Sequence, residues 1–179
     1  MRSGEILFLS ALIICLSCAQ DKNPLESPPV AAGDGYFVIK TEKTDFSWEL
    51  GESSYYVQVN GSIRNTGDQV FYSRIGDAYN MADSMLFHIT GNSGGQVEKF
   101  NSAAKSWEKC EIIGLAYEGT KYVPIIPGNT YFYSALLSIN TGENKVTGSF
   151  RIVLDYCPEK KPGDNTLFYR DYSNVFTIE

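Results

Sequence analysis

The chain has 179 residues, of which 43% are hydrophobic and 13% aromatic, and its formal net charge at pH 7 is −6. That length fits one domain with a short extension, and it suffices for a full core without metal ions or dense disulfides. An acidic chain lacks the basic surface that nucleic-acid binding and electrostatic adhesion to anionic lipid require. Composition therefore argues against both of these functions.

The chain opens with an apolar run from Ile6 to Leu16, preceded by the positive charge of Arg2. A helix of about eleven residues rises about 16 Å, roughly half of a hydrocarbon core of about 30 Å. Such a run is too short for a stable membrane span, but it suits the apolar region of a secretory signal. We therefore expect this segment to direct export.

The apolar run ends at Leu16 and Ser17, directly before Cys18. This arrangement resembles the lipobox of bacterial lipoproteins, although Cys15 occupies the position where that family usually has leucine. The resemblance implies a signal peptide of residues 1–17 and an acylated Cys18 as the first residue of the mature chain. The lipid bilayer would then be a partner, and the protein would lie at the bacterial envelope, on the outer membrane, facing the periplasm or the surface. An ordinary signal peptide cleaved elsewhere, or an uncleaved anchor, are the alternatives.

Residues 18–34 follow the signal peptide and contain three of the seven prolines, with no hydrophobic periodicity. Segments of this composition do not bury enough apolar surface to fold by themselves. We expect a stalk that reaches at most about 55 Å when fully extended.

Cys110 and Cys157 are the cysteines left after the signal peptide and Cys18. In an exported chain two remaining thiols most simply form one disulfide, which we predict here. Two unpaired, buried cysteines are the alternative. The single histidine, His88, and the lack of a CxxC pair give no indication of a metal site.

From residue 35 onward the hydrophobic pattern has a period of two, which is typical of half-buried antiparallel strands. Tyr55, Val57, Val59 and Ile63 alternate with polar residues. A second such stretch is GSFRIVLDYC, with one apolar face that holds the residues Phe150, Ile152, Leu154 and Tyr156. Shorter strands are expected at residues 70–72, around Cys110, at 131–137 and at 175–178, with 84–90 and 96–100 paired as a hairpin. No helical period is sustained, so we predict an all-β antiparallel sandwich over residues 35–179, with a small barrel as the alternative.

Three short motifs carry a second resemblance: Pro127-Gly128, the strand of residues 148–152, and residues 173–176. Together they resemble the immunoglobulin-like domains of uncharacterised bacterial lipoproteins. The overall sequence pattern is also similar to that of proteinase-inhibitor-like immunoglobulin folds. The resemblance implies a sandwich architecture. It also raises a protease inhibitor as a possible function, with a reactive loop within residues 73–122.

We find no catalytic constellation in the sequence and expect a protein that is not an enzyme and carries no cofactor. His88 could act as a general base, but no nucleophile motif accompanies it, and a plain strand histidine is the simpler interpretation. The acidic residues are scattered, and no calcium-loop pattern occurs. GDNT at residues 163–166 is interpreted as a solvated turn.

Neighbouring aromatic residues on strands must direct one ring of each pair away from the core. Tyr56, Phe132 and Tyr169 are the rings that we expect on the surface, where they could stack on sugars or anchor a protein partner. Alternatively, such rings only stabilise the sheet through cross-strand pairs. The sequence thus favours a protein-interaction or adhesion module, with a carbohydrate-binding module and a protease inhibitor as alternatives.

Overall fold

The computed structural model describes residues 33–75, 79–81, 84–89, 95–110 and 121–179. Within these ranges the chain forms fourteen strands and no helix, which confirms the all-β prediction. None of these residues belongs to a helix long and apolar enough to cross a bilayer. The strands are β1 (Phe37–Thr41), β2 (Asp45–Phe46), β3 (Glu49–Leu50), β4 (Ser54–Asn65), β5 (Phe71–Ile75), β6 (Tyr79–Met81), β7 (Ser84–Ile89), β8 (Gly95–Asn101), β9 (Ser106–Lys109), β10 (Lys121–Ile125), β11 (Thr130–Asn140), β12 (Gly148–Tyr156), β13 (Tyr169–Tyr172) and β14 (Phe176–Ile178).

The first layer, which we call the β4 sheet, has the strand order β1–β4–β11–β7–β6, and β3 pairs with the early part of β4. β4 and β11 are antiparallel along almost their whole length, whereas β7 runs parallel to residues 132–135 of β11. Val57, Val59 and Ile63 are buried on the inner face of β4, as the alternating pattern predicts.

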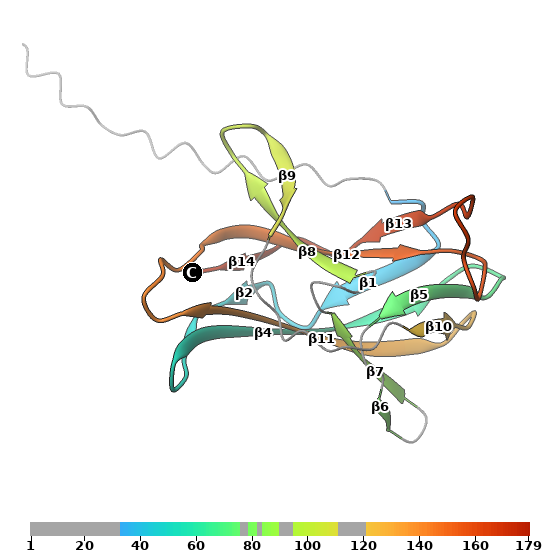
Figure 1. The fold of residues 1–179 in the computed structure, drawn as a ribbon, viewed down its shortest axis with the longest axis horizontal. Coiled ribbons are helices and arrows are strands. Elements are labelled where there is room, and N and C mark those ends of the chain that lie inside the picture. Colours follow the sequence, from blue (N-terminus) through green and yellow to red (C-terminus); the bar gives the residue numbers. More distant parts are fainter. Residues whose placement is uncertain (1–32, 76–78, 82–83, 90–94, 111–120) are drawn as a thin grey trace, which may run out of the picture.

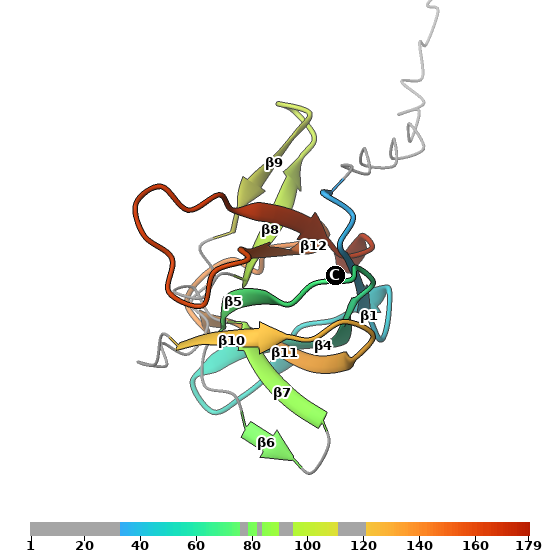
Figure 2. The ribbon, with the colours of Figure 1, turned by 90° about the vertical axis from the view of Figure 1, so that its right-hand side faces the viewer.

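The second layer, the β12 sheet, has the order β2–β14–β12–β8–β9, with β13 also paired to β12. A two-stranded ribbon of β5 and β10 joins this layer, because Tyr72 and Cys157 exchange two backbone hydrogen bonds of 2.7 and 2.9 Å. The β12 sheet lies over the β4 sheet in Figure 1, and Figure 2 shows the β5–β10 ribbon at the end of the molecule. An isolated bridge between Ile39 of β1 and Ser173 connects the layers at one edge, but each layer keeps its own strand ladder, as in a sandwich.

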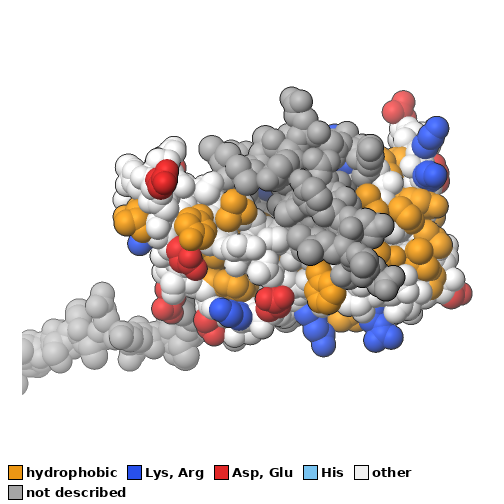
Figure 3. Space-filling view, turned by 90° about the horizontal axis from the view of Figure 1, so that it is seen from below, with side chains coloured by type: hydrophobic (Ala, Val, Ile, Leu, Met, Phe, Trp, Pro, Cys, Tyr) orange, Lys and Arg blue, Asp and Glu red, His pale blue; other side chains and the backbone are white. Residues whose placement is uncertain are grey.

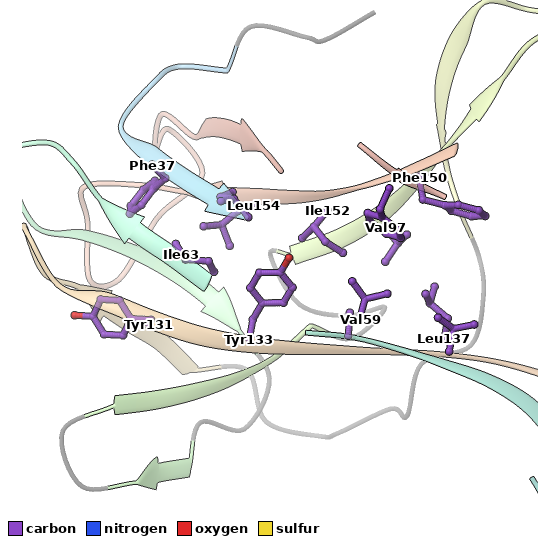
Figure 4. Packing of buried hydrophobic residues seen from close by; sticks show 14 of the residues in the cluster. Phe37, Val59, Ile63, Val97, Tyr131, Tyr133, Leu137, Phe150, Ile152 and Leu154 are labelled. Carbon is purple, nitrogen blue, oxygen red and sulfur yellow. The ribbon is translucent and has the colours of Figure 1, made fainter. Parts of the chain in front are cut away.

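The core fills the space between the two sheets. Val59 and Leu137 come from the β4 sheet, and Ile152 and Leu154 face them from the β12 sheet (Figure 4). At one end the rings of Phe37, Phe71 and Tyr156 pack edge to face, with centroids 4.3 to 5.7 Å apart. Such edge-to-face pairs add to the free energy that their burial supplies.

The first residues of the domain, Gly33 to Phe37, are hydrogen-bonded to β13. The buried Asp171 carboxylate accepts 2.8 Å hydrogen bonds from the backbone N–H groups of Gly35 and Phe37, and a 2.7 Å hydrogen bond from the Tyr156 hydroxyl. Beside it, the Asp34 backbone N–H donates a hydrogen bond to the Arg170 carbonyl oxygen, and the Asp34 carboxylate accepts one from the Arg170 backbone N–H. Residues 1–32, with the predicted signal peptide, Cys18 and most of the predicted stalk, lie outside the described residues.

The prediction of a hairpin between residues 84–90 and 96–100 is wrong. β7 pairs with β11 and β6 in the β4 sheet, whereas β8 pairs with β12 and β9 in the β12 sheet. An alternating pattern indicates which face of a strand is buried but not which strand lies beside it. Here the free edge of the long β11 strand accepts β7.

The predicted disulfide is also wrong, because Cys110 and Cys157 are not joined. Cys110 lies next to Val97 of β8, which pairs with Ile152 of β12. Cys157 lies five residues beyond Ile152 on β12, which corresponds to about 17 Å along the strand. The two strand spacings from Cys110 across β8 to β12 add about 10 Å perpendicular to the strands. Disulfides need Cα atoms within about 7 Å, so this register does not allow the bond.

Candidate binding face of the β4 sheet

Alternation along β4 and β11 defines an outer face of the β4 sheet. Because Val57, Val59 and Ile63 face the core, the residues between them face away from it. The antiparallel register then places Tyr56 beside Ser138, Asn60 beside Ser134, and Ser62 beside Phe132. We call this outer surface, between Tyr56 and Phe132, the candidate binding face.

Phe132 is the most exposed ring of this face, with 46% of its surface accessible. Its neighbours on β11, Tyr131 and Tyr133, are buried in the core. Ser62 lies next to it across β4, and Lys40 of β1 pairs with Ser62 in turn. The expectation that Phe132 is directed outward is confirmed.

Tyr56 marks the other end of the face and is half-buried. Glu49 of β3 pairs with it in register, and interaction with the Glu49 carboxylate raises the pKa of Tyr56. Tyr55, its neighbour, packs against the core. The structure therefore places Tyr56 on the outer face, as expected, beside Glu49.

A row of amide and hydroxyl groups lies between the two rings. The Gln58 amide nitrogen donates 3.2 Å hydrogen bonds to the Asn60 side-chain oxygen and to the Ser134 hydroxyl. Six residues along β4 separate Tyr56 from Ser62, the partner of Phe132, which corresponds to about 20 Å. The face thus combines two aromatic rings with a hydrogen-bonding strip between them.

Tyr169 does not belong to this face, and its expected exposure is wrong. It pairs in register with Tyr156, so its ring turns inward and stacks on Tyr156 at 5.8 Å and 20°. The exposed ring of this pair is Phe168, with 49% of its surface accessible. Choosing between the two rings required the register of β13 against β12, which the sequence does not reveal.

A second polar cluster, which sequence reasoning missed, lies on the outer side of the β12 sheet. Arg151 is buried, donates two hydrogen bonds of 2.6 and 2.8 Å to Glu98, and lies between the rings of Trp107 and Tyr172. Its guanidinium carbon is 4.3 and 3.9 Å from the two ring centroids. The acid and the rings offset the charge, although Nη1 of Arg151 is buried without a hydrogen-bond partner among the described residues, and we interpret the cluster as structural.

The other candidate residues are placed as follows. His88 lies on β7 opposite Ser134 of β11, and the structure does not describe its side chain. Gly163 and Thr166 close a hydrogen-bonded turn, as interpreted from GDNT. Within the described residues, no three His, Cys, Asp or Glu side chains come together as a metal site. Much of the region of residues 73–122, with the inhibitor's expected reactive loop, lies outside the described residues.

Fold and face together define an all-β sandwich that presents an aromatic and polar sheet surface. No family model matches the chain, and no curated protein matches it. Among solved structures, it is similar to the N-terminal domain of PorA, with 11% identity and a TM-score of 0.36. That match covers 80% of this chain and 97% of the PorA chain.

Proposed function

We propose that this protein is a non-enzymatic lipoprotein of the bacterial envelope, with an immunoglobulin-like sandwich that binds a protein partner. Acylated Cys18 would hold it on the membrane, most simply the outer membrane, facing the periplasm or the surface. The candidate binding face would make the contact.

The exposure of Phe132 is the observation that carries this proposal. A large ring exposed on a sheet face costs free energy in water, and it gains most when a partner covers it. Aromatic anchors surrounded by polar groups are typical of the centre of a protein interface. The Gln58, Asn60 and Ser134 groups beside it supply such a polar surround.

Metabolic labelling with a fatty acid tests the anchor. The native chain should carry the label and fractionate with membranes, and a Cys18→Ala variant should lose both properties. Cys15→Ala is the matched control and should be labelled like the native chain. Equal labelling of the Cys18→Ala variant and the native chain would contradict acylation at Cys18.

Mild crosslinking followed by a pull-down tests the binding face. A partner captured by the native protein should bind Phe132→Ala roughly tenfold more weakly, which corresponds to about 1.4 kcal/mol. Leu50→Ala is a suitable control, because Leu50 is 68% exposed and lies outside this face. Recovery of the lipoprotein alone, or equal loss in both variants, would count against the proposal.

Carbohydrate binding is the second candidate, and the strip between Tyr56 and Phe132 favours it. Rings stack on sugar faces, while amides and hydroxyls bond to sugar hydroxyls, and a length of about 20 Å suits an extended chain of several sugars. Binding to insoluble polysaccharides or a glycan array should be lost in both Tyr56→Ala and Phe132→Ala. A protein that binds no glycan in either assay rules this candidate out.

A further inference from the structure

Exposed apolar side chains of the described residues concentrate at one end of the sandwich. We call this the tether-side end and define it by Val70, Ile126, Leu167 and Phe168. Leu167 and Phe168 are 64% and 49% exposed. Figure 2 looks onto this end, which is the right-hand end of the molecule in Figures 1 and 3. Hydrophobic side chains are visible there in Figure 3.

These four residues flank side chains that contact one another, so they belong to one surface. Val70 and Ile126 directly adjoin Phe71 and Ile125, which pair in register on β5 and β10. Leu167 and Phe168 precede Tyr169, whose ring is 5.8 Å from that of Phe71. The packed core beneath therefore holds the exposed residues at a common end.

The chain enters the domain at this end. Gly35 and Phe37 are hydrogen-bonded to Asp171, and Asp34 to Arg170, which fixes the entry point against β13. From Gly33, fifteen residues lead back to Cys18, so the two are at most about 50 Å apart. A membrane that holds Cys18 therefore lies within this distance of the tether-side end.

The charges at the tether-side end nearly balance. At the tether-side end Asp34 and Asp155 both bond to Arg170, and exposed basic residues accompany the other acids there. Those basic residues are Arg64, Lys160 and Lys161, and the acids are Asp68, Glu159 and Asp164. The opposite end exposes Asp45, Glu49, Glu52, Glu143 and Glu179 with Lys43 and Lys145, and the β8–β9 hairpin beside it adds Lys105 and Lys109 with Glu108. The tether-side end therefore combines apolar side chains with a nearly balanced charge, so no large net charge opposes its approach to a lipid surface.

We propose that the tether-side end docks onto the lipid bilayer, with Leu167 and Phe168 in the interfacial layer. This inference rests on acylation of Cys18, because the end's own apolar area is small. Once the acyl chains have placed the domain near the bilayer, shallow insertion of a few apolar side chains requires little further affinity. Docking would direct the opposite end of the sandwich away from the lipid and leave its sides accessible.

Quenching of tryptophan fluorescence by brominated lipid tests the docking. Acylated full-length mature protein is placed on vesicles of phosphatidylethanolamine and phosphatidylcholine, and flotation is measured in the same samples. Phe168→Trp should be quenched about twofold more strongly than Leu50→Trp at the opposite end, after subtraction of the native Trp48 and Trp107 signal. Both replaced residues are exposed, so the fold should tolerate both variants.

The outcomes separate the two proposals. If the protein does not float with the vesicles, acylation of Cys18 is contradicted, and the docking proposal, which depends on it, is contradicted too. Flotation with equal quenching of the two variants overturns the docking alone. A blue shift of Phe168→Trp emission that appears without lipid and grows with protein concentration would assign this end to a second copy of the chain, which also overturns bilayer docking.

Discussion

Tyr133 carries its hydroxyl group into the apolar space between the two sheets (Figure 4). Among the described residues this hydroxyl oxygen has no hydrogen-bond partner. Burial, and secondarily the charge of Glu42, raises the pKa of Tyr133 above its ordinary value. A buried polar group without a partner costs free energy, so Tyr133 is a weak point inside an otherwise apolar core.

Tyr133→Phe should therefore stabilise the protein at pH 7 by about 1 kcal/mol. The variant should also change the response to alkali. A phenol whose pKa is raised on folding keeps its proton in the folded state, while the unfolded chain loses it near pH 10, so native stability falls as pH rises through that value. Denaturant titrations at pH 7 and above pH 10 should show that Tyr133→Phe loses less of its free energy of unfolding between these pH values than the native protein does. An equal loss would contradict the assignment to Tyr133, and Tyr131→Phe is the control.

At the scale of elements, β4 depends on a close approach at Gly61. This residue pairs with Thr41 of β1 and with Tyr133 of β11. A Cβ atom here would overlap the backbone oxygen of Lys40 and the end of the Tyr133 ring. The absence of a side chain thus lets the ring lie across the strand, which the sequence shows only as a polar interruption in the alternation.

We expect Gly61→Ala to destabilise the domain by about 2–3 kcal/mol, because the Lys40 backbone is not free to move aside. Ser62→Ala, one residue on and directed outward, should change stability by less than about 0.5 kcal/mol. Urea denaturation followed by circular dichroism measures both values. A near-neutral Gly61→Ala would show that β1 and β4 are less tightly packed than the structure indicates.

How far the sequence predicts these elements depends on what each pattern encodes. Alternation predicted the buried faces of β4 and β12 and the outward direction of Phe132, because burial acts on each strand separately. It did not predict that β7 joins β11, or that Tyr169 faces Tyr156, since these depend on strand pairing between distant segments. The Arg151 cluster was missed for the same reason: Glu98, Trp107 and Tyr172 reach it from three other strands.

For the whole molecule, the register keeps Cys110 and Cys157 apart, so no disulfide between these two residues stabilises the sandwich. Burial raises the pKa of the Cys157 thiol, which also donates a 3.3 Å hydrogen bond to the Glu159 carbonyl oxygen. A protonated, buried thiol is a poor nucleophile, so Cys157 should resist modification in the native state.

A reducing agent should accordingly leave the Tm of the exported, mature protein unchanged, whereas loss of a native disulfide from a domain of this size would lower stability by about 2–5 kcal/mol. Without reductant, alkylation in denaturant followed by mass measurement should modify both Cys110 and Cys157. In native buffer Cys157 should react far more slowly, because the thiolate forms only when the fold opens. A mass lower by two hydrogen atoms, with neither residue alkylated in denaturant, would reveal a disulfide. The register of β8 against β12 would then have to differ from the one described. The Cys157→Ala variant distinguishes a disulfide within one chain from a disulfide between two chains. With only Cys110 left, a bond within the chain is lost, whereas two chains can still be linked through Cys110.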